Sequence, residues 1–153
     1  MVKKIKRHPV KPETKYNSVL LARFINLVMK KGKKSLAERI VYKTLDIIKE
    51  KASKNELEVF KDAINNVKPV VEIKSKRIGG ATYQIPVSVE ETRSESFAFR
   101  WILEATHGSS GRSMPERLAQ EILDAYNKTG KAMAKREATH RMAEANKAFA
   151  HFA

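Results

Sequence analysis

Apolar side chains recur every three or four residues in six stretches of the chain, which is the period of a helix that buries one face. In the first stretch Leu20 and Phe24 lie on such a face. Gly32 is a typical helix end, with Lys30 and Lys31 as cations in the last turn. The final stretch is rich in alanine and has no Gly or Pro, which favours helix throughout. The pattern predicts helices over about residues 17–32, 35–49, 55–68, 92–107, 113–130 and 132–149.

Four of these helices are predicted to begin at a capping residue that is followed three positions later by Glu. In such a pair, the first side chain and the carboxylate each accept a hydrogen bond from a free backbone N–H at the helix start. Because capping accounts for these glutamates, we interpret them as structural and not catalytic. The pairs are Ser35 with Glu38, Asn55 with Glu58, Thr92 with Glu95, and Ser113 with Glu116.

Residues 71–89 change to a period of two, in which apolar and polar side chains alternate as they do on a strand. Gly79 and Gly80 separate two such runs and tolerate the positive φ angles of a tight hairpin turn. Pro86 cannot donate a ladder hydrogen bond, so it marks its strand as an edge. We predict a β-hairpin over about residues 70–90. Since two strands do not form an independent sheet, it must lean on the helices or project as an arm.

The predicted fold is mainly α: a single domain of about six helices, with a protruding β-hairpin between the third and fourth helices and a basic N-terminal arm. With 153 residues, of which 42% are hydrophobic, the chain is large enough to bury one core. Residues 1–15 carry Pro9 and Pro12 among lysines and show no periodicity, so we interpret them as a basic extension. Residues 16–153 form the predicted helical domain.

Positive charge is concentrated at the start of the chain. The first 34 residues contain eleven Lys or Arg and a single acid, Glu13, so they hold +10 of the formal net charge of +14. The last 23 residues are also basic, with five Lys or Arg against two acids, whereas the middle is nearly neutral. Such patches attract polyanions and supply phosphate contacts, which favours a nucleic acid as the partner.

The sequence lacks the residue patterns of an enzyme. It has no cysteine for disulfides or thiolate metal sites, and its four histidines stand far apart. Neither a phosphate-binding glycine loop nor a Gly-x-Ser-x-Gly nucleophile elbow occurs. The basic start also lacks the apolar stretch of a secretory leader, and no run of about 18 apolar residues predicts a membrane span. We therefore predict no catalytic residues, no cofactor, no metal site, and a reducing interior compartment.

Two further segments favour binding to RNA. Lys74, Lys76 and Arg77 lie just before the Gly-Gly turn, so a basic ribbon would end in a narrow tip, near which Tyr83 is able to stack on a base. A charged edge that prevents strand-to-strand aggregation explains the same bases, and packing explains Tyr83 equally well. The final helix adds a cationic surface. Helix ends, arms and a hairpin suit RNA of irregular shape better than a regular duplex.

Several short sequence motifs, taken in their order along the chain, resemble those of a known family. They are Tyr16-Asn17-Ser18, Gly32-Lys33-Lys34-Ser35, PVVEIK at 69–74, RIGGATYQ at 77–84, Arg100-Trp101, and HRMAEANKAFAH at 140–151. From about Tyr16 to His151 the chain resembles the bacterial-type small-subunit ribosomal protein seven family.

The resemblance implies a structural constituent of the small ribosomal subunit that binds the three-prime major domain of ribosomal RNA and helps start assembly of the subunit head. It implies a hairpin near exit-site tRNA and the mRNA path, neighbouring head and platform proteins, and a cytoplasmic or organellar ribosome. The matching positions imply tRNA or mRNA proximity for Ile78, Gly79, Gly80, Ala81, Thr82 and Tyr83. They imply rRNA contacts for Lys3, Lys4, Lys6, Arg7, Arg23, Lys30, Lys31, Lys33, Lys34, Lys74, Lys76, Arg77, Arg93, Arg112, Met114, Lys131, Lys135, Arg136, His140 and Arg141.

A different class of protein fits the charge distribution alone. A free architectural nucleic-acid-binding protein or an RNA chaperone would also carry basic ends around a neutral core. The two hypotheses differ in whether the protein travels with small ribosomal subunits or binds duplex DNA equally well.

Overall fold

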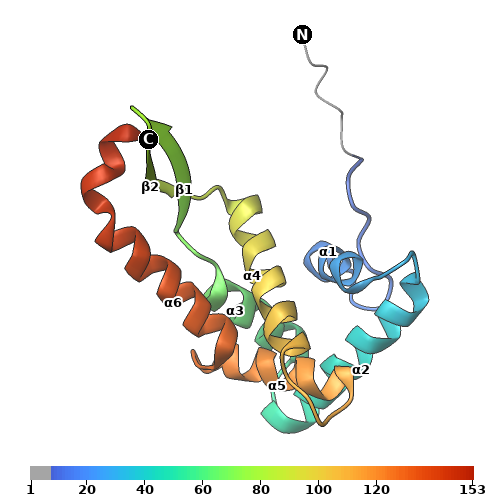
Figure 1. Ribbon diagram of the computed structural model, residues 1–153. Coiled ribbons are helices and arrows are strands. Elements are labelled where there is room, and N and C mark those ends of the chain that lie inside the picture. Colours follow the sequence, from blue (N-terminus) through green and yellow to red (C-terminus); the bar gives the residue numbers. More distant parts are fainter. Residues whose placement is uncertain (1–7) are drawn as a thin grey trace.

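A computed structural model describes residues 8–153, and Lys3, Lys4, Lys6 and Arg7 lie outside this range. Within it the chain is mainly α, with one two-stranded antiparallel hairpin between the third and fourth helices, as predicted (Figure 1). The α-helices are α1 (Val19–Val28), α2 (Lys34–Ala52), α3 (Glu56–Val67), α4 (Glu91–His107), α5 (Met114–Tyr126) and α6 (Gly130–Ala145). The strands are β1 (Val71–Ile78) and β2 (Ala81–Ser88), and a 3-10 helix, η1 (Lys147–Phe152), follows α6.

One hydrophobic core joins the helices. Phe24 of α1 lies at its centre, with its ring centroid 5.2 Å from that of Phe60 and 5.3 Å from that of Phe99, so α1, α3 and α4 meet there. Leu45 of α2 and Ile122 of α5 are buried in the same cluster. Within residues 8–153, no helix is both long and apolar enough to cross a membrane.

Two of the four predicted caps are confirmed. The Asn55 side chain accepts hydrogen bonds from the backbone N–H groups of Leu57 and Glu58, at 3.0 and 3.2 Å. Ser113 and Glu116 form a capping box, in which the Ser113 N–H donates to the Glu116 carboxylate at 3.1 Å and lowers the pKa of that carboxyl.

The predicted caps at Ser35 and Thr92 are wrong, because both residues lie inside the first turn of their helices. Lys31 and Gly32 adopt left-handed φ angles of 53° and 72°, which turn the chain so that α2 starts at Lys34 without a side-chain cap. Helix α4 starts at Glu91, since the hydroxyl of Ser94 donates to the carbonyl of Pro69 at 2.7 Å and fixes that turn.

Three predicted helix ends also differ from the structure. Helix α1 ends at Val28, so Lys30 and Lys31 lie beyond its last turn. Gly130 begins α6 and does not end α5; its φ is +90°, and a Cβ there would lie 2.9 Å from Cβ of Asp124. The last helix stops at Ala145, where the Asn146 side chain donates to the carbonyl of Met142 at 2.8 Å.

The hairpin has the predicted strands and turn, and it leans on the C-terminal segment. Its register pairs Val71 with Ser88 and Ile78 with Ala81 around the Gly79-Gly80 turn. The end of α6 and η1 run alongside it (Figure 1). Contacts at both ends of the hairpin therefore hold it against α6 and η1.

Candidate nucleic-acid interface

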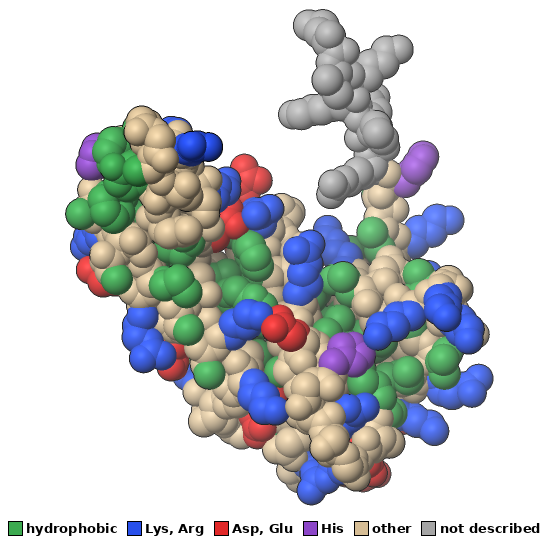
Figure 2. Space-filling view, viewed as in Figure 1, with side chains coloured by type: hydrophobic (Ala, Val, Ile, Leu, Met, Phe, Trp, Pro, Cys, Tyr) green, Lys and Arg blue, Asp and Glu red, His purple; other side chains and the backbone are tan. Residues whose placement is uncertain are grey.

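A groove of about 610 Å³ lies between α1, α4 and residues 8–10 of the N-terminal segment. Arg23 of α1 and Arg93 and Arg100 of α4 line it. Figure 2 shows Lys and Arg side chains around the hollow between α1 and α4 and over the turn between α1 and α2. We call this feature the arginine groove.

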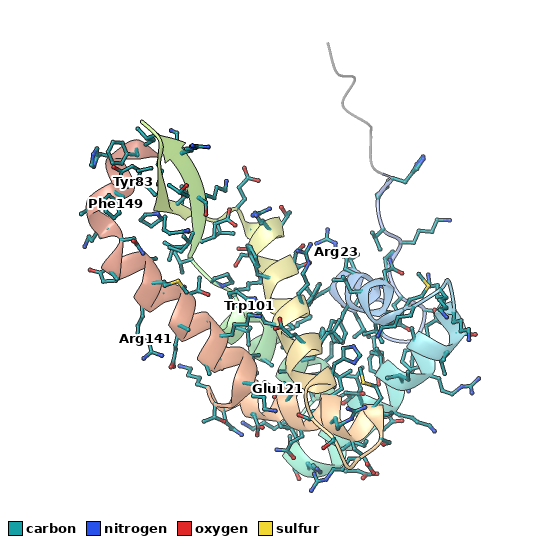
Figure 3. All side chains as sticks on the ribbon, viewed as in Figure 1. Arg23, Tyr83, Trp101, Glu121, Arg141 and Phe149 are labelled. Carbon is teal, nitrogen blue, oxygen red and sulfur yellow. The ribbon has the colours of Figure 1, made fainter. Side chains whose placement is uncertain are left out.

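Arg23 projects from the side of α1 that faces α4 (Figure 3). Its Nη1 donates to Oε1 of Glu95 at 3.1 Å, and this pair joins two residues that lie 72 positions apart in the chain. The Arg23 side chain is 45% exposed and that of Glu95 only 12%. One edge of the guanidinium is therefore held while much of it remains accessible.

Arg93 is held more firmly than Arg23. Its Nε lies 2.9 Å from both carboxylate oxygens of Glu72, and its Nη2 lies 2.8 Å from Oε2. The guanidinium also lies over the ring of Phe97, 5.1 Å from its centroid, and the bonds to Glu72 raise the pKa of Arg93. A planar guanidinium fixed along one edge keeps donors on its other nitrogen for a phosphate.

Sequence reasoning missed Arg100 as a site residue. It is exposed in the arginine groove and lies seven residues after Arg93, which is two helical turns and therefore the same face of α4. That spacing was the signal that would have found it.

A second basic surface covers the turn into α2. Lys30, Lys31, Lys33 and Lys34 are all exposed there, and none of the ion pairs formed within residues 8–153 involves them. Burial and the charges of Lys30 and Arg117 lower the pKa of His107 beside this surface. We call these four residues the lysine corner.

The hairpin bases have partners of their own. Lys74 lies 3.5 Å from the Glu72 carboxylate, and Nζ of Lys76 donates to the carbonyl of Phe152 at 2.7 Å. Arg77 is exposed, as are residues 79–82 of the tip, and Ile78 is half-buried. Tyr83 packs against Phe149 and Phe152, with ring centroids 5.3 and 5.4 Å away, so its ring already has aromatic partners within the chain (Figure 3).

Two of the predicted contacts on α6 hold the base of the hairpin. Nε of Arg136 donates to the carbonyl of Lys68 at 3.2 Å, and Nε2 of His140 accepts the N–H of Val70 at 3.1 Å. Burial, together with the charge of Arg136, lowers the pKa of His140, which favours the neutral ring that this acceptor role requires.

The remaining predicted positions of α6 and its neighbouring loop lie near the surface. Lys135 pairs with Glu104 at 2.5 Å, and Lys131 approaches the carbonyl of Gly108 at 3.5 Å. Arg141 projects from the outer side of α6, away from the hairpin (Figure 3). Arg112 is exposed in the loop that leads into α5, and Met114, the first residue of α5, is half-buried. Across residues 8–153, no three acidic or histidine side chains are grouped as metal ligands would be.

Comparison with known proteins gives one consistent match. The family model described as ribosomal protein S7p/S5e matches residues 2–147. The protein named small ribosomal subunit protein uS7 from Treponema denticola is 57% identical over 95% of this chain and 94% of its own length. Proteins of the same name from Thermotoga neapolitana and Chloroflexus aggregans are 54% and 53% identical, over 98% and 97% of this chain and 97% and 94% of their own lengths.

Proposed function

Because the chain belongs to the ribosomal protein S7p/S5e family, we propose that it is a structural constituent of the small ribosomal subunit. Members of this family are non-enzymatic, and this chain is not an enzyme. Its partner in the proposal is the three-prime major domain of small-subunit ribosomal RNA, which it binds early to start assembly of the subunit head. The cytoplasmic ribosome is the proposed location, since the relatives described above are bacterial proteins.

The lysine corner is the observation that carries the RNA-binding proposal. Helix α2 begins there without a side-chain cap. The Lys34 N–H donates to the carbonyl of Gly32, whereas the N–H groups of Ser35 and Leu36 have no partner among the described residues. Four exposed ammonium groups stand beside them, although positive charge at a helix N-terminus opposes the helix dipole. A phosphate would satisfy both the free N–H groups and the cations. The corner is therefore built at some cost to α2 and is suited to an anion.

The arginine groove and the hairpin supply the rest of the proposed interface. Arg93, fixed by Glu72, offers its free nitrogen to phosphate, and Arg100 adds a cation on the same face. The exposed tip at residues 79–82 supports the proposed position near exit-site tRNA and the mRNA path. Other head and platform proteins are the proposed protein neighbours. The RNA contacts of Arg136 and His140 stay a prediction, since both have partners inside the chain.

Charge reversal at the lysine corner tests the proposal. Binding of the double variant K33E/K34E to a transcript of the three-prime major domain should be weaker, and its dependence on salt shallower. If both lysines contact phosphate, the slope of log K against log salt should fall by about 1.4 to 1.8. Acidic residues at the start of α2 favour the helix dipole, so the variant should remain folded.

The matched control is K49E/K51E, which makes the same change in net charge at the other end of the same helix. Its salt slope should stay close to that of the wild type. Equal slopes for the two double variants would remove the lysine corner from the interface. Equal binding of the wild type to duplex DNA would instead favour a free architectural binder.

A further inference from the structure

The arginine groove contains one acid among its lining residues within 8–153. Glu95 lies there with Arg23, Arg93 and Arg100, and its side chain is only 12% exposed. A carboxylate repels the phosphates that the three arginines attract. Its presence in the groove therefore needs an explanation beyond the overall charge of the chain.

Glu95 is only partly neutralised by its neighbours. Within the described residues, its carboxylate accepts one hydrogen bond, from Nη1 of Arg23 to Oε1, and none is formed to Oε2. Glu72, by contrast, is held by three contacts from Arg93 and lies outside the groove lining. Glu95 thus leaves an acceptor oxygen and negative charge on the groove wall.

The pair with Arg23 adds little to folding. Ion pairs with one partner in solvent typically contribute little to stability, and Arg23 is 45% exposed. The core already joins α1 to α4 through Phe24 and Phe99. Glu95 is therefore not needed to hold α1 against α4.

We propose that Glu95 is a specificity-determining residue that excludes phosphate from the part of the groove beside Arg23. The groove then accepts a strand that places a hydrogen-bond donor at this point, either a ribose 2′-hydroxyl or an exocyclic base amine. Polyanions that place a phosphate there are rejected, which is discrimination by repulsion. This inference rests on the proposed function and adds to it that Glu95 discriminates among nucleic acids.

The variant E95Q tests this directly. Gln keeps the shape and a carbonyl acceptor, so it still receives a donor, but it no longer repels phosphate. Dissociation constants are measured for the three-prime major domain transcript, an unrelated RNA of equal length and a single-stranded DNA of equal length. E95Q should tighten binding to the two unrelated strands by roughly threefold or more, and change binding to the transcript less.

The matched control is E91Q, which makes the same change in net charge one turn earlier on α4. Glu91 pairs with Lys68 and does not line the groove. The ratio of transcript to unrelated-strand affinity should fall in E95Q and stay unchanged in E91Q.

Each outcome separates the inference from the proposed function. If the wild type binds the transcript and the unrelated strands with nearly equal affinity, the proposed function is overturned. A high wild-type ratio that E95Q leaves unchanged would overturn only the inference. Weaker binding of E95Q to all three strands would also overturn it, because Glu95 would then act by positioning Arg23.

Discussion

At the scale of single residues, buried carboxylates connect separate elements of the chain. Glu13 is buried and accepts hydrogen bonds from the N–H of Tyr16 and the hydroxyl of Tyr42, which anchors the start of the domain to α2. Burial, together with nearby carboxylates, raises the pKa values of both tyrosines to about 12. Glu121 likewise anchors α6 to α5, because its Oε1 accepts a hydrogen bond from the N–H of Ala132 at 2.8 Å (Figure 3).

Glu121 gives a prediction for the pH dependence of stability. Burial raises its pKa, although the Ala132 N–H acts in the opposite direction. A raised pKa means that the folded state holds the proton more firmly, so this contribution to stability is present at acidic pH and lost as pH rises through the raised pKa. E121Q removes this titration. Its free energy of unfolding, relative to the wild type, should increase from pH 4 to pH 7 in urea titrations.

The variant E121A serves as the comparison for this prediction. It leaves the buried Ala132 N–H without an acceptor, which should lower the free energy of unfolding by about 1 to 3 kcal/mol relative to E121Q at all pH values, since neither variant titrates at this position. If the difference between E121Q and the wild type does not change with pH, the pKa of Glu121 is not raised by burial.

At the scale of elements, the sequence pattern predicted the features that depend on contacts between residues close together in the chain. The period-two alternation and Gly79-Gly80 define the hairpin because register follows from side-chain alternation and a two-residue turn. Asn55 and Ser113 were predicted for the same reason, since a cap bonds to residues beside it. The start of α4 was not predictable in this way, because it depends on the contact of Ser94 with Pro69.

The sequence predicted which basic residues belong to the candidate site but not how they are arranged in space. Arg23, Arg93 and the lysine corner follow from charge and from the resemblance. Their grouping into a groove depends on the packing of α1 against α4 through Phe24 and Phe99, whose sequence separation of 75 residues leaves no periodic signal. For the same reason Glu95 was interpreted as a capping residue. Tertiary contacts of this kind override the local pattern at the helix start.

The contact between the hairpin and η1 gives a prediction at this scale. Tyr83 packs against both Phe149 and Phe152, and aromatic pairs contribute about 0.5 to 1.5 kcal/mol. F149A should therefore speed amide hydrogen exchange in residues 74–85 by roughly 2- to 10-fold, while the helical core is unchanged. M142A truncates an exposed side chain of α6 and is the matched control. Unchanged exchange in F149A would show that η1 does not hold the hairpin.

At the scale of the whole molecule, the domain core and the basic ends have separate tasks. The core is a single cluster to which α1 through α6 contribute, and within residues 8–153 the acids of α4 each pair with a base or lie exposed. The bases of the lysine corner have no such pairs among the described residues. Stability and polyanion binding should then respond to different changes in the sequence.

Deletion of residues 2–7 tests that separation. This segment holds four bases and no acid, and it precedes Glu13, where the chain is anchored to α2. The free energy of unfolding should stay within about 0.5 kcal/mol of the wild type. The salt slope for the three-prime major domain transcript should fall, by up to about 2.8 to 3.6 if all four bases contact phosphate.

Two comparisons interpret the result of that deletion. A full-length variant with Gln at Lys3, Lys4, Lys6 and Arg7 should give the same slope as the deletion if charge alone matters. Combining the deletion with K33E/K34E should add the two reductions in slope, since phosphate contacts at separate places release counterions independently. A deletion that retains the full wild-type slope would show that the N-terminal bases do not contact RNA, and the interface would then reduce to the arginine groove, the lysine corner and the hairpin.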